Sequence, residues 1–173
     1  AAVRYVQGQT STDEPGTDFI LYDHNAQFAS AEEVLSSRTD GGTSFEAACG
    51  KIQEYIETQA AAGSTVRVVF MTDDQGSLSD HAKQSFRDYL KSSGREVSVN
   101  TLGFSEGHKQ AFLEELRTMG TSEGIYTYAD PAEPGALESA FNKIFDLIGA
   151  QRTVTIEGVE GSLQAIPTPL DDG

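Results

Sequence analysis

Hydrophobic residues recur at helical spacing in several stretches of the chain. The clearest stretch starts at Phe45, after which apolar residues return every three or four positions as far as Ile56. Ser79 is a suitable N-cap for a later helix, and Gly94 is a suitable end for it. The same spacing predicts further helices over residues 31–36, 108–119 and 137–148, and residues 1–7 resemble the end of a helix.

Short apolar runs lie between these predicted helices. Residues 65–71 (TVRVVFM) are mostly β-branched or apolar and lead into a polar loop, which predicts a buried, central strand. Similar runs predict strands over residues 18–22, 97–104 and 124–130. An alternation of strands and helices is typical of a parallel sheet, so we predict an α/β, Rossmann-like three-layer domain with helices on both faces of a mostly parallel sheet.

The pattern changes after residue 150. Residues 152–166 alternate like a hairpin or edge strands, and the final PTPLDDG resembles a linker. We therefore expect residues 1–150 to form the α/β domain and residues 151–173 to form a β tail that leads to a neighbouring domain or packs on the sheet edge.

The composition narrows the choice of partners. The chain has 12 basic and 27 acidic residues, a net charge of −15, without a cluster of Lys and Arg, which argues against nucleic acid or an anionic membrane as partner. We expect no insertion into a membrane, since no apolar run approaches transmembrane length. The single cysteine, Cys49, falls on the apolar stripe of the helix that starts at Phe45, so we expect a core residue.

Two oxygen-bearing side chains lie where an α/β sheet binds ligands. Asp73 comes just after the strand 65–71, and ligands of open α/β sheets bind beyond the carboxyl ends of the strands. Thr43 follows two glycines, which allow its loop to turn tightly. Together they would suit Mg²⁺, Mn²⁺ or Ca²⁺. On pattern alone, Asp73 can equally be a turn or helix-cap carboxylate, and Thr43 an ordinary N-cap.

Other candidate chemistry is weak. His24, His81 and His108 lack the spacing of a zinc site, and we expect them at the surface, although His24 follows a strand end and can face the candidate site. The chain contains neither a phosphate-binding GxxxxGK[ST] loop nor a G-x-S-x-G elbow.

Five segments, taken in order, resemble the von Willebrand factor A-type domain. They are FILYDHN (19–25), DGGTSF (40–45), VVFMTDD (68–74), VNTLGF (99–104) and GIYTYA (124–129). The likeness covers residues 1 to about 148. It implies that Thr43 and Asp73 are ligands of a metal-ion-dependent adhesion site, at which an acidic residue of a protein partner completes the coordination of Mg²⁺. It also slightly favours an extracellular location.

The sequence departs from this family in two places. The Asp-x-Ser-x-Ser motif that follows the family's first strand is missing, so we expect an upstream segment or a second chain to supply that strand. Thr43 and Asp73 alone cannot fill about six oxygen positions. Without the strand, two sheet edges would be exposed, and we expect that the isolated chain is not a stable monomer. Asp74 stands where the family usually has glycine, as an outer-shell group or a solvent-facing residue.

Three functions follow from these features. The first is a metal-dependent protein-binding or adhesion module. The second is a structural or assembly subunit that uses the same fold without a working metal site. The third is an enzyme with Asp73 as nucleophile or ligand, which we do not expect because no suitably placed lysine or second carboxylate supports it.

Overall fold

The computed structural model describes residues 18–36, 42–73 and 75–150. Its elements are β1 (Phe19–Tyr22), β2 (Ala26–Ala29), α2 (Ala31–Ser36), α3 (Phe45–Thr58), β3 (Thr65–Thr72), α4 (Asp80–Ser92), β4 (Glu96–Gly103), α5 (Gln110–Leu116), β5 (Tyr126–Tyr128) and α6 (Ala136–Ala150). The predicted termini, residues 1–7 and the tail 151–173, lie outside the described residues.

The described strands form two separate sheets. β3, β4 and β5 are parallel and lie in that order, with Thr65 opposite Glu96 and Thr72 opposite Gly103. β1 pairs with β2 in an antiparallel hairpin. The prediction that residues 65–71 form a central strand is therefore wrong for the described sheet, in which β4 is the middle strand. β2 was not predicted, and β1 does not join β3 by backbone hydrogen bonds among the described residues.

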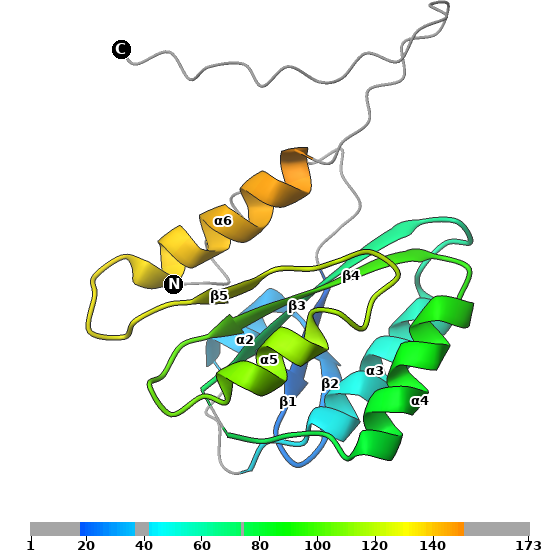
Figure 1. Cartoon of the computed structure of the whole chain (residues 1–173), viewed down its shortest axis with the longest axis horizontal. Helices are drawn as coiled ribbons and strands as arrows, with labels where there is room; N and C mark the ends of the chain where they lie inside the picture. The colour runs from blue at the N-terminus through cyan, green and yellow to red at the C-terminus, as the bar shows by residue number, and fades with distance from the viewer. Residues whose placement is uncertain (1–17, 37–41, 74, 151–173) are drawn as a thin grey trace, which may run out of the picture.

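Helices cover both faces of the three-stranded sheet, as predicted (Figure 1). Side chains alternate along each strand, so neighbouring residues belong to different layers. Val66 and Phe70 of β3 pack in the core formed with α3, α4 and α5, whereas Val69 and Met71 pack in the core formed with α6. The Rossmann-like, three-layer α/β architecture expected from the alternation is confirmed.

The helices pack against the sheet through the apolar stripes from which they were predicted. The stripe of α3 is buried, including Ile56 at 0% exposure and Cys49 at 5%, so Cys49 is a core residue as expected. α4 and α5 bury Phe86, Leu90 and Leu113 on the same side of the sheet. Full burial of each large apolar side chain stabilises the fold by about 1.5–3 kcal/mol.

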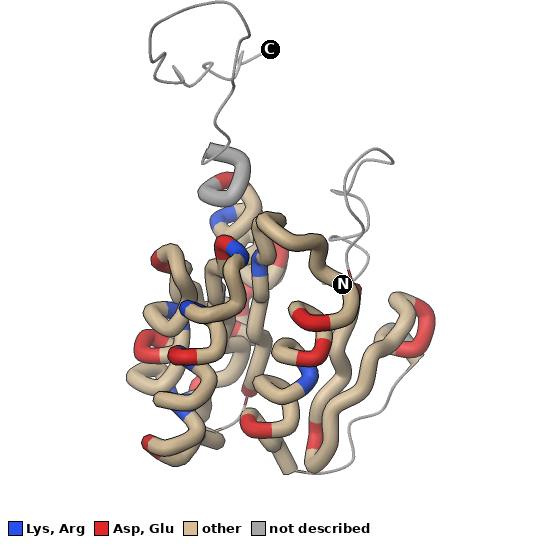
Figure 2. The backbone as a smooth tube through the Cα atoms, turned by 90° about the vertical axis from the view of Figure 1, so that its right-hand side faces the viewer, with Lys and Arg blue, Asp and Glu red and all other residues tan. Residues whose placement is uncertain are grey.

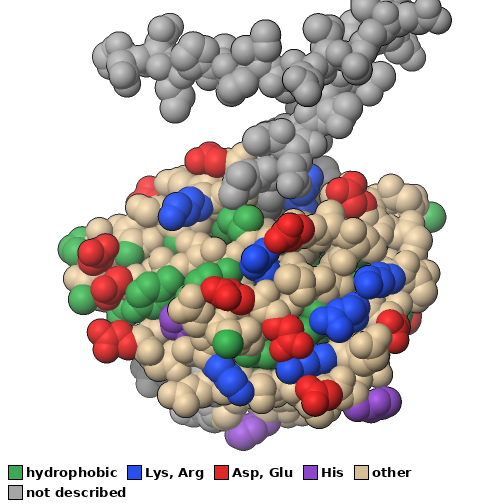
Figure 3. Space-filling view, viewed as in Figure 1, with side chains coloured by type: hydrophobic (Ala, Val, Ile, Leu, Met, Phe, Trp, Pro, Cys, Tyr) green, Lys and Arg blue, Asp and Glu red, His purple; other side chains and the backbone are tan. Residues whose placement is uncertain are grey.

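Charged residues surround this core. Figure 2 shows acidic positions distributed over helices and loops on both sides of the sheet. On the face shown in Figure 3, basic side chains lie among acidic ones, without a continuous patch of one sign. Within the described part of the chain, no helix has both the length and the apolar character needed to cross a bilayer.

Candidate metal site

Thr43 lies in the segment that leads into α3 and is partly buried. Two backbone N–H groups of this segment donate hydrogen bonds to residues just after β1. The Ser44 N–H donates to the Asp23 carbonyl at 2.6 Å, and the Gly42 N–H donates to Nε2 of His24 at 3.1 Å. His24 thus faces the candidate site, which was one of its predicted placements.

The N-cap of α3 is Ser44, whose hydroxyl accepts from the Ala47 N–H at 3.2 Å. Thr43 precedes this cap, so the simpler explanation of Thr43 as the N-cap does not apply. Asp73 is likewise no helix cap, because Ser79 caps α4. Two of the roles considered for the Asp73 carboxylate are left, that of a turn residue and that of a metal ligand.

Asp73 follows directly after β3, at the carboxyl end of the parallel sheet, and its side chain is exposed. The next loop residues reach back toward Thr43: a Cβ on Gly76 would lie 3.5 Å from the Thr43 carbonyl oxygen and would press against the Phe45 ring. The segments that carry Thr43 and Asp73 therefore lie at the same end of the molecule. Among the described contacts, none joins the two side chains directly.

The donor chemistry suits a hard cation, but the number of donors is small. A threonine hydroxyl and an aspartate carboxylate are oxygen ligands of the kind that Mg²⁺ prefers. Within residues 18–36, 42–73 and 75–150, no group of three or more His, Cys, Asp or Glu side chains is arranged to hold a metal ion. Thr43 and Asp73 fit the family's site only as two of about six ligands, the others coming from water and from other residues. Asp74 lies outside the described residues.

Sequence reasoning missed two residues near Asp73. Ser105, just after β4, donates its hydroxyl to the Asp73 carbonyl at 2.6 Å. His108 was expected at the surface, and it is partly buried there: its ring stacks on the exposed Tyr128, with centroids 5.0 Å apart. The signal that could have found both is their position, since they follow β4, the strand next to β3, and Asp73 follows β3.

The parallel sheet with helices on both faces, and with candidate ligands at its carboxyl end, defines a Rossmann-like α/β protein. More specifically, the fold is similar to that of a solved structure of von Willebrand factor type A from Catenulispora acidiphila, with a TM-score of 0.60 and 13% sequence identity over 83% of this chain. The chain thus has a von Willebrand factor A-like fold, and at this identity the likeness establishes the fold alone.

The match spans 35% of that structure's own length, so this chain corresponds to about a third of it. An uncharacterized membrane-spanning protein from Vibrio fischeri also matches, at 12% identity over 75% of this chain and 74% of that one, but its TM-score of 0.33 is too low to indicate a shared fold. No family model and no curated protein matches the sequence.

Proposed function

We propose that the chain is a protein-interaction module in which Thr43 and Asp73 contribute to a divalent-metal site that an acidic residue of a partner completes. The observation that carries this proposal is the placement of both residues at one end of the molecule, on segments tied to the ends of β1 and β4. Bound there, Mg²⁺ would supply a positive charge for a partner carboxylate within an otherwise acidic molecule.

The test measures binding of Mn²⁺ and Mg²⁺ to the intact protein by calorimetry. We expect saturable binding that Asp73→Ala abolishes, because the carboxylate is the only formally charged ligand among the two residues. Thr43→Ala should weaken it. Asp88→Ala removes an exposed carboxylate from α4 and is the matched control, which should bind as the wild type does.

Partner binding should disappear when a chelator removes the metal and should return with Mg²⁺. Equal metal binding by the wild type and by Asp73→Ala would contradict the proposed site. Partner binding that survives chelation would contradict the proposed mechanism.

One observation favours a second candidate function, that of an assembly subunit. Among the described residues, β1 and β3 have no backbone hydrogen bonds to each other, and the Met71 carbonyl of β3 accepts from the Tyr22 hydroxyl at 2.7 Å. The long side chain of Tyr22 spans the space between the strands, whereas neighbouring strands of one sheet lie about 4.8 Å apart and pair through the backbone.

Residues of β1 and β3 pack together in both hydrophobic clusters, one on each face of the sheet. Ile20 and Tyr22 pack in the same apolar cluster as Phe70, while Phe19 packs in the cluster that contains Val69 and Met71. A strand between β1 and β3 would therefore be buried on both faces and must be apolar throughout. We propose that an upstream segment, or a second chain, supplies this strand.

Amide hydrogen exchange tests the inserted strand. If it is present in the intact protein, the amides of β1 and β3 that point away from β2 and β4 will be protected as strongly as those that point toward them. Exchange of the outward amides at the rate of an open edge would contradict the proposal. An assembly role without metal predicts this protection together with an absence of Mn²⁺ binding.

A further inference from the structure

The loop between β4 and α5 is bonded to the end of β3. The Ser105 hydroxyl donates to the Asp73 carbonyl at 2.6 Å, and the Phe104 N–H donates to the Thr72 carbonyl at 3.2 Å. These two contacts join consecutive residues of the loop to consecutive residues at the end of β3. They extend the β3–β4 pairing beyond the sheet and fix the backbone at Asp73.

His108 anchors the same loop to β5. Its Nδ1 donates to the Ser105 carbonyl, and because a carbonyl can only accept, Nδ1 carries the proton. In the neutral ring Nε2 is then an acceptor, and it receives the Tyr126 hydroxyl at 2.6 Å. The ring also stacks on Tyr128, with centroids 5.0 Å apart and planes inclined by 21°. Both hydrogen bonds and the stacking thus hold one orientation of the ring.

Gly103, the last residue of β4, provides the space for this ring. A Cβ at Gly103 would overlap the imidazole of His108. With the ring in this place, a continuous set of hydrogen bonds runs from Asp73 through Ser105 and His108 to Tyr126 on β5.

We infer that Ser105 and His108 are positioning residues for the proposed metal site and that they hold Asp73 where its carboxylate can bind the ion. This inference rests on the proposed function. The Asp73 side chain is exposed, so neighbouring side chains do not restrain it by packing. A fixed backbone carbonyl limits the freedom of the residue before the metal binds, and such supporting contacts commonly set metal affinity.

The test compares Ser105→Ala with Ser105→Thr in the intact protein, using Mn²⁺ as the probe. Loss of one hydrogen bond should weaken Mn²⁺ binding roughly two- to tenfold in Ser105→Ala, while the threonine hydroxyl should restore it. In the absence of metal, the backbone amides of Gln75 and Gly76 should exchange faster in Ser105→Ala than in the wild type or in Ser105→Thr. Ser85→Ala, an exposed serine on α4, is the matched control and should leave affinity and exchange unchanged.

His108→Phe provides a second variant, which keeps an aromatic ring over Gly103 and loses both hydrogen bonds. His108→Phe should weaken Mn²⁺ binding as Ser105→Ala does. If Ser105→Ala does not fold, His108→Phe tests the positioning role by itself. Wild-type affinity and exchange in either folded variant would overturn the positioning role and leave the proposed site in place. A wild-type protein that binds no Mn²⁺ would overturn the proposed site and this inference with it.

Discussion

Asn100 joins the three parallel strands at the level of a single side chain. It is 4% exposed; its amide donates to the Val68 carbonyl of β3 at 3.1 Å, and its Oδ1 accepts from the Ile125 N–H beside β5 at 3.2 Å. Asn100→Ala would remove the partner of the partly buried Val68 carbonyl and of the partly buried Ile125 N–H, so we expect a loss of about 1–3 kcal/mol in the free energy of unfolding. Urea denaturation measures it, and Asn142→Ala, exposed on α6, should change little. Similar losses in the two variants would contradict the bridging role.

Cys49 gives a prediction about alkaline pH. Burial, and then the negative charge of Glu46, raise the pKa of its thiol from 9.0 to about 12 in the folded protein. Above pH 9 the unfolded chain loses the proton while the folded chain keeps it, so the stability that the thiol contributes is present below pH 9 and is lost as the pH rises toward 12. The free energy of unfolding should fall, relative to Cys49→Ala, by at most about 1.4 kcal/mol per pH unit.

The comparison with Cys49→Ala separates this effect from the titration of tyrosines, which both proteins share. Urea denaturation at several pH values between 7 and 10.5 measures the difference in unfolding free energy. A difference that stays constant across this range would show that the thiol titrates normally in the folded state.

At the residue scale, the sequence identified side chains that are defined by a motif and missed those defined by contacts. Thr43 and Asp73 stand out because a glycine pair and a strand end mark their positions. Ser105 and His108 carry no such local mark. Their importance arises from hydrogen bonds to residues 32 and 18 positions away, which no short sequence window contains.

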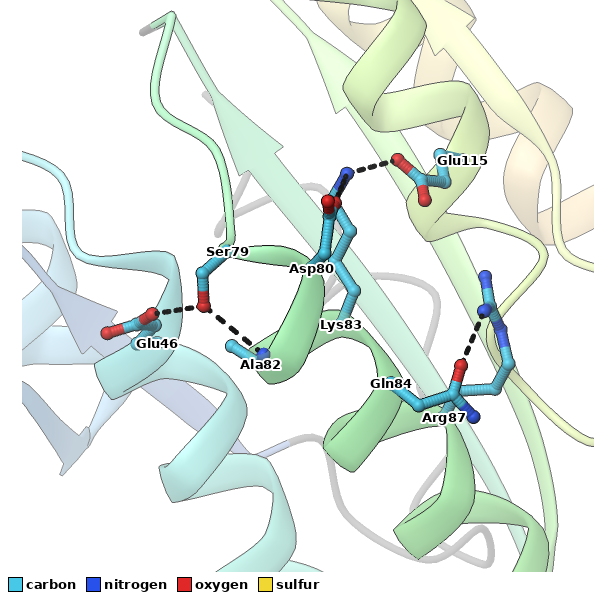
Figure 4. Close-up of polar contacts among 8 residues, drawn as sticks. All are labelled: Glu46, Ser79, Asp80, Ala82, Lys83, Gln84, Arg87 and Glu115. Carbon is cyan, nitrogen blue, oxygen red and sulfur yellow. Dashed lines mark hydrogen bonds and ion pairs between the residues drawn. The ribbon is translucent and has the colours of Figure 1, made fainter.

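Among the elements, α4 begins at an N-cap residue that also contacts α3. The Ser79 hydroxyl accepts from the Ala82 N–H at 3.2 Å and donates to the Glu46 carboxylate of α3 at 3.3 Å (Figure 4). Ser79→Ala should lower the free energy of unfolding by about 1 kcal/mol, and Ser79→Gly by only a few tenths. Chemical denaturation with Ser77→Ala as control tests this, and equal effects of alanine and glycine would argue against a capping role.

The elements predicted from sequence were those with a strong period or a continuous apolar run. α3, α4, β3 and β4 appear close to their expected bounds because each buries a stripe or a face that selects its residues. β2 was missed because its four residues, AQFA, are too few to show alternation and contain no β-branched side chain. Its pairing with β1 depends on tertiary contacts. Because of this pairing, β1, which was expected in the parallel sheet, is one strand of an antiparallel hairpin.

For the molecule as a whole, sequence and structure contribute differently to the description of the sheet and of the charge distribution. The order of elements predicted the α/β fold, and the missing family strand was expected to leave two sheet edges exposed. The three-dimensional arrangement adds that β1 and β3 are the strands that are not paired with each other. The composition gives a net charge of −15, and the structure adds that Asp and Glu positions lie on both sides of the sheet (Figure 2). Among the described residues, few of these acidic side chains form ion pairs; one that does is Glu115 of α5, which pairs with Lys83 of α4 at 2.7 Å.

The net charge of −15 predicts how stability responds to salt. Repulsion among like charges opposes the compact state more than the expanded one, and added salt screens it. We expect the free energy of unfolding to rise by on the order of 1 kcal/mol between low ionic strength and about 0.15 M NaCl, where the Debye length is about 8 Å. Thermal or urea denaturation at several NaCl concentrations measures the rise.

Choline chloride at equal ionic strength is the control for simple screening, because a bulky monovalent cation screens as sodium does but cannot enter an oxygen site. Both salts should give the same increase. MgCl₂ at matched ionic strength should exceed them in the wild type and equal them in Asp73→Ala, since only specific binding to the folded state adds stability beyond screening. An equal response to all three salts in the wild type would leave the acidic surface as the whole explanation and would contradict a Mg²⁺ site at Thr43 and Asp73.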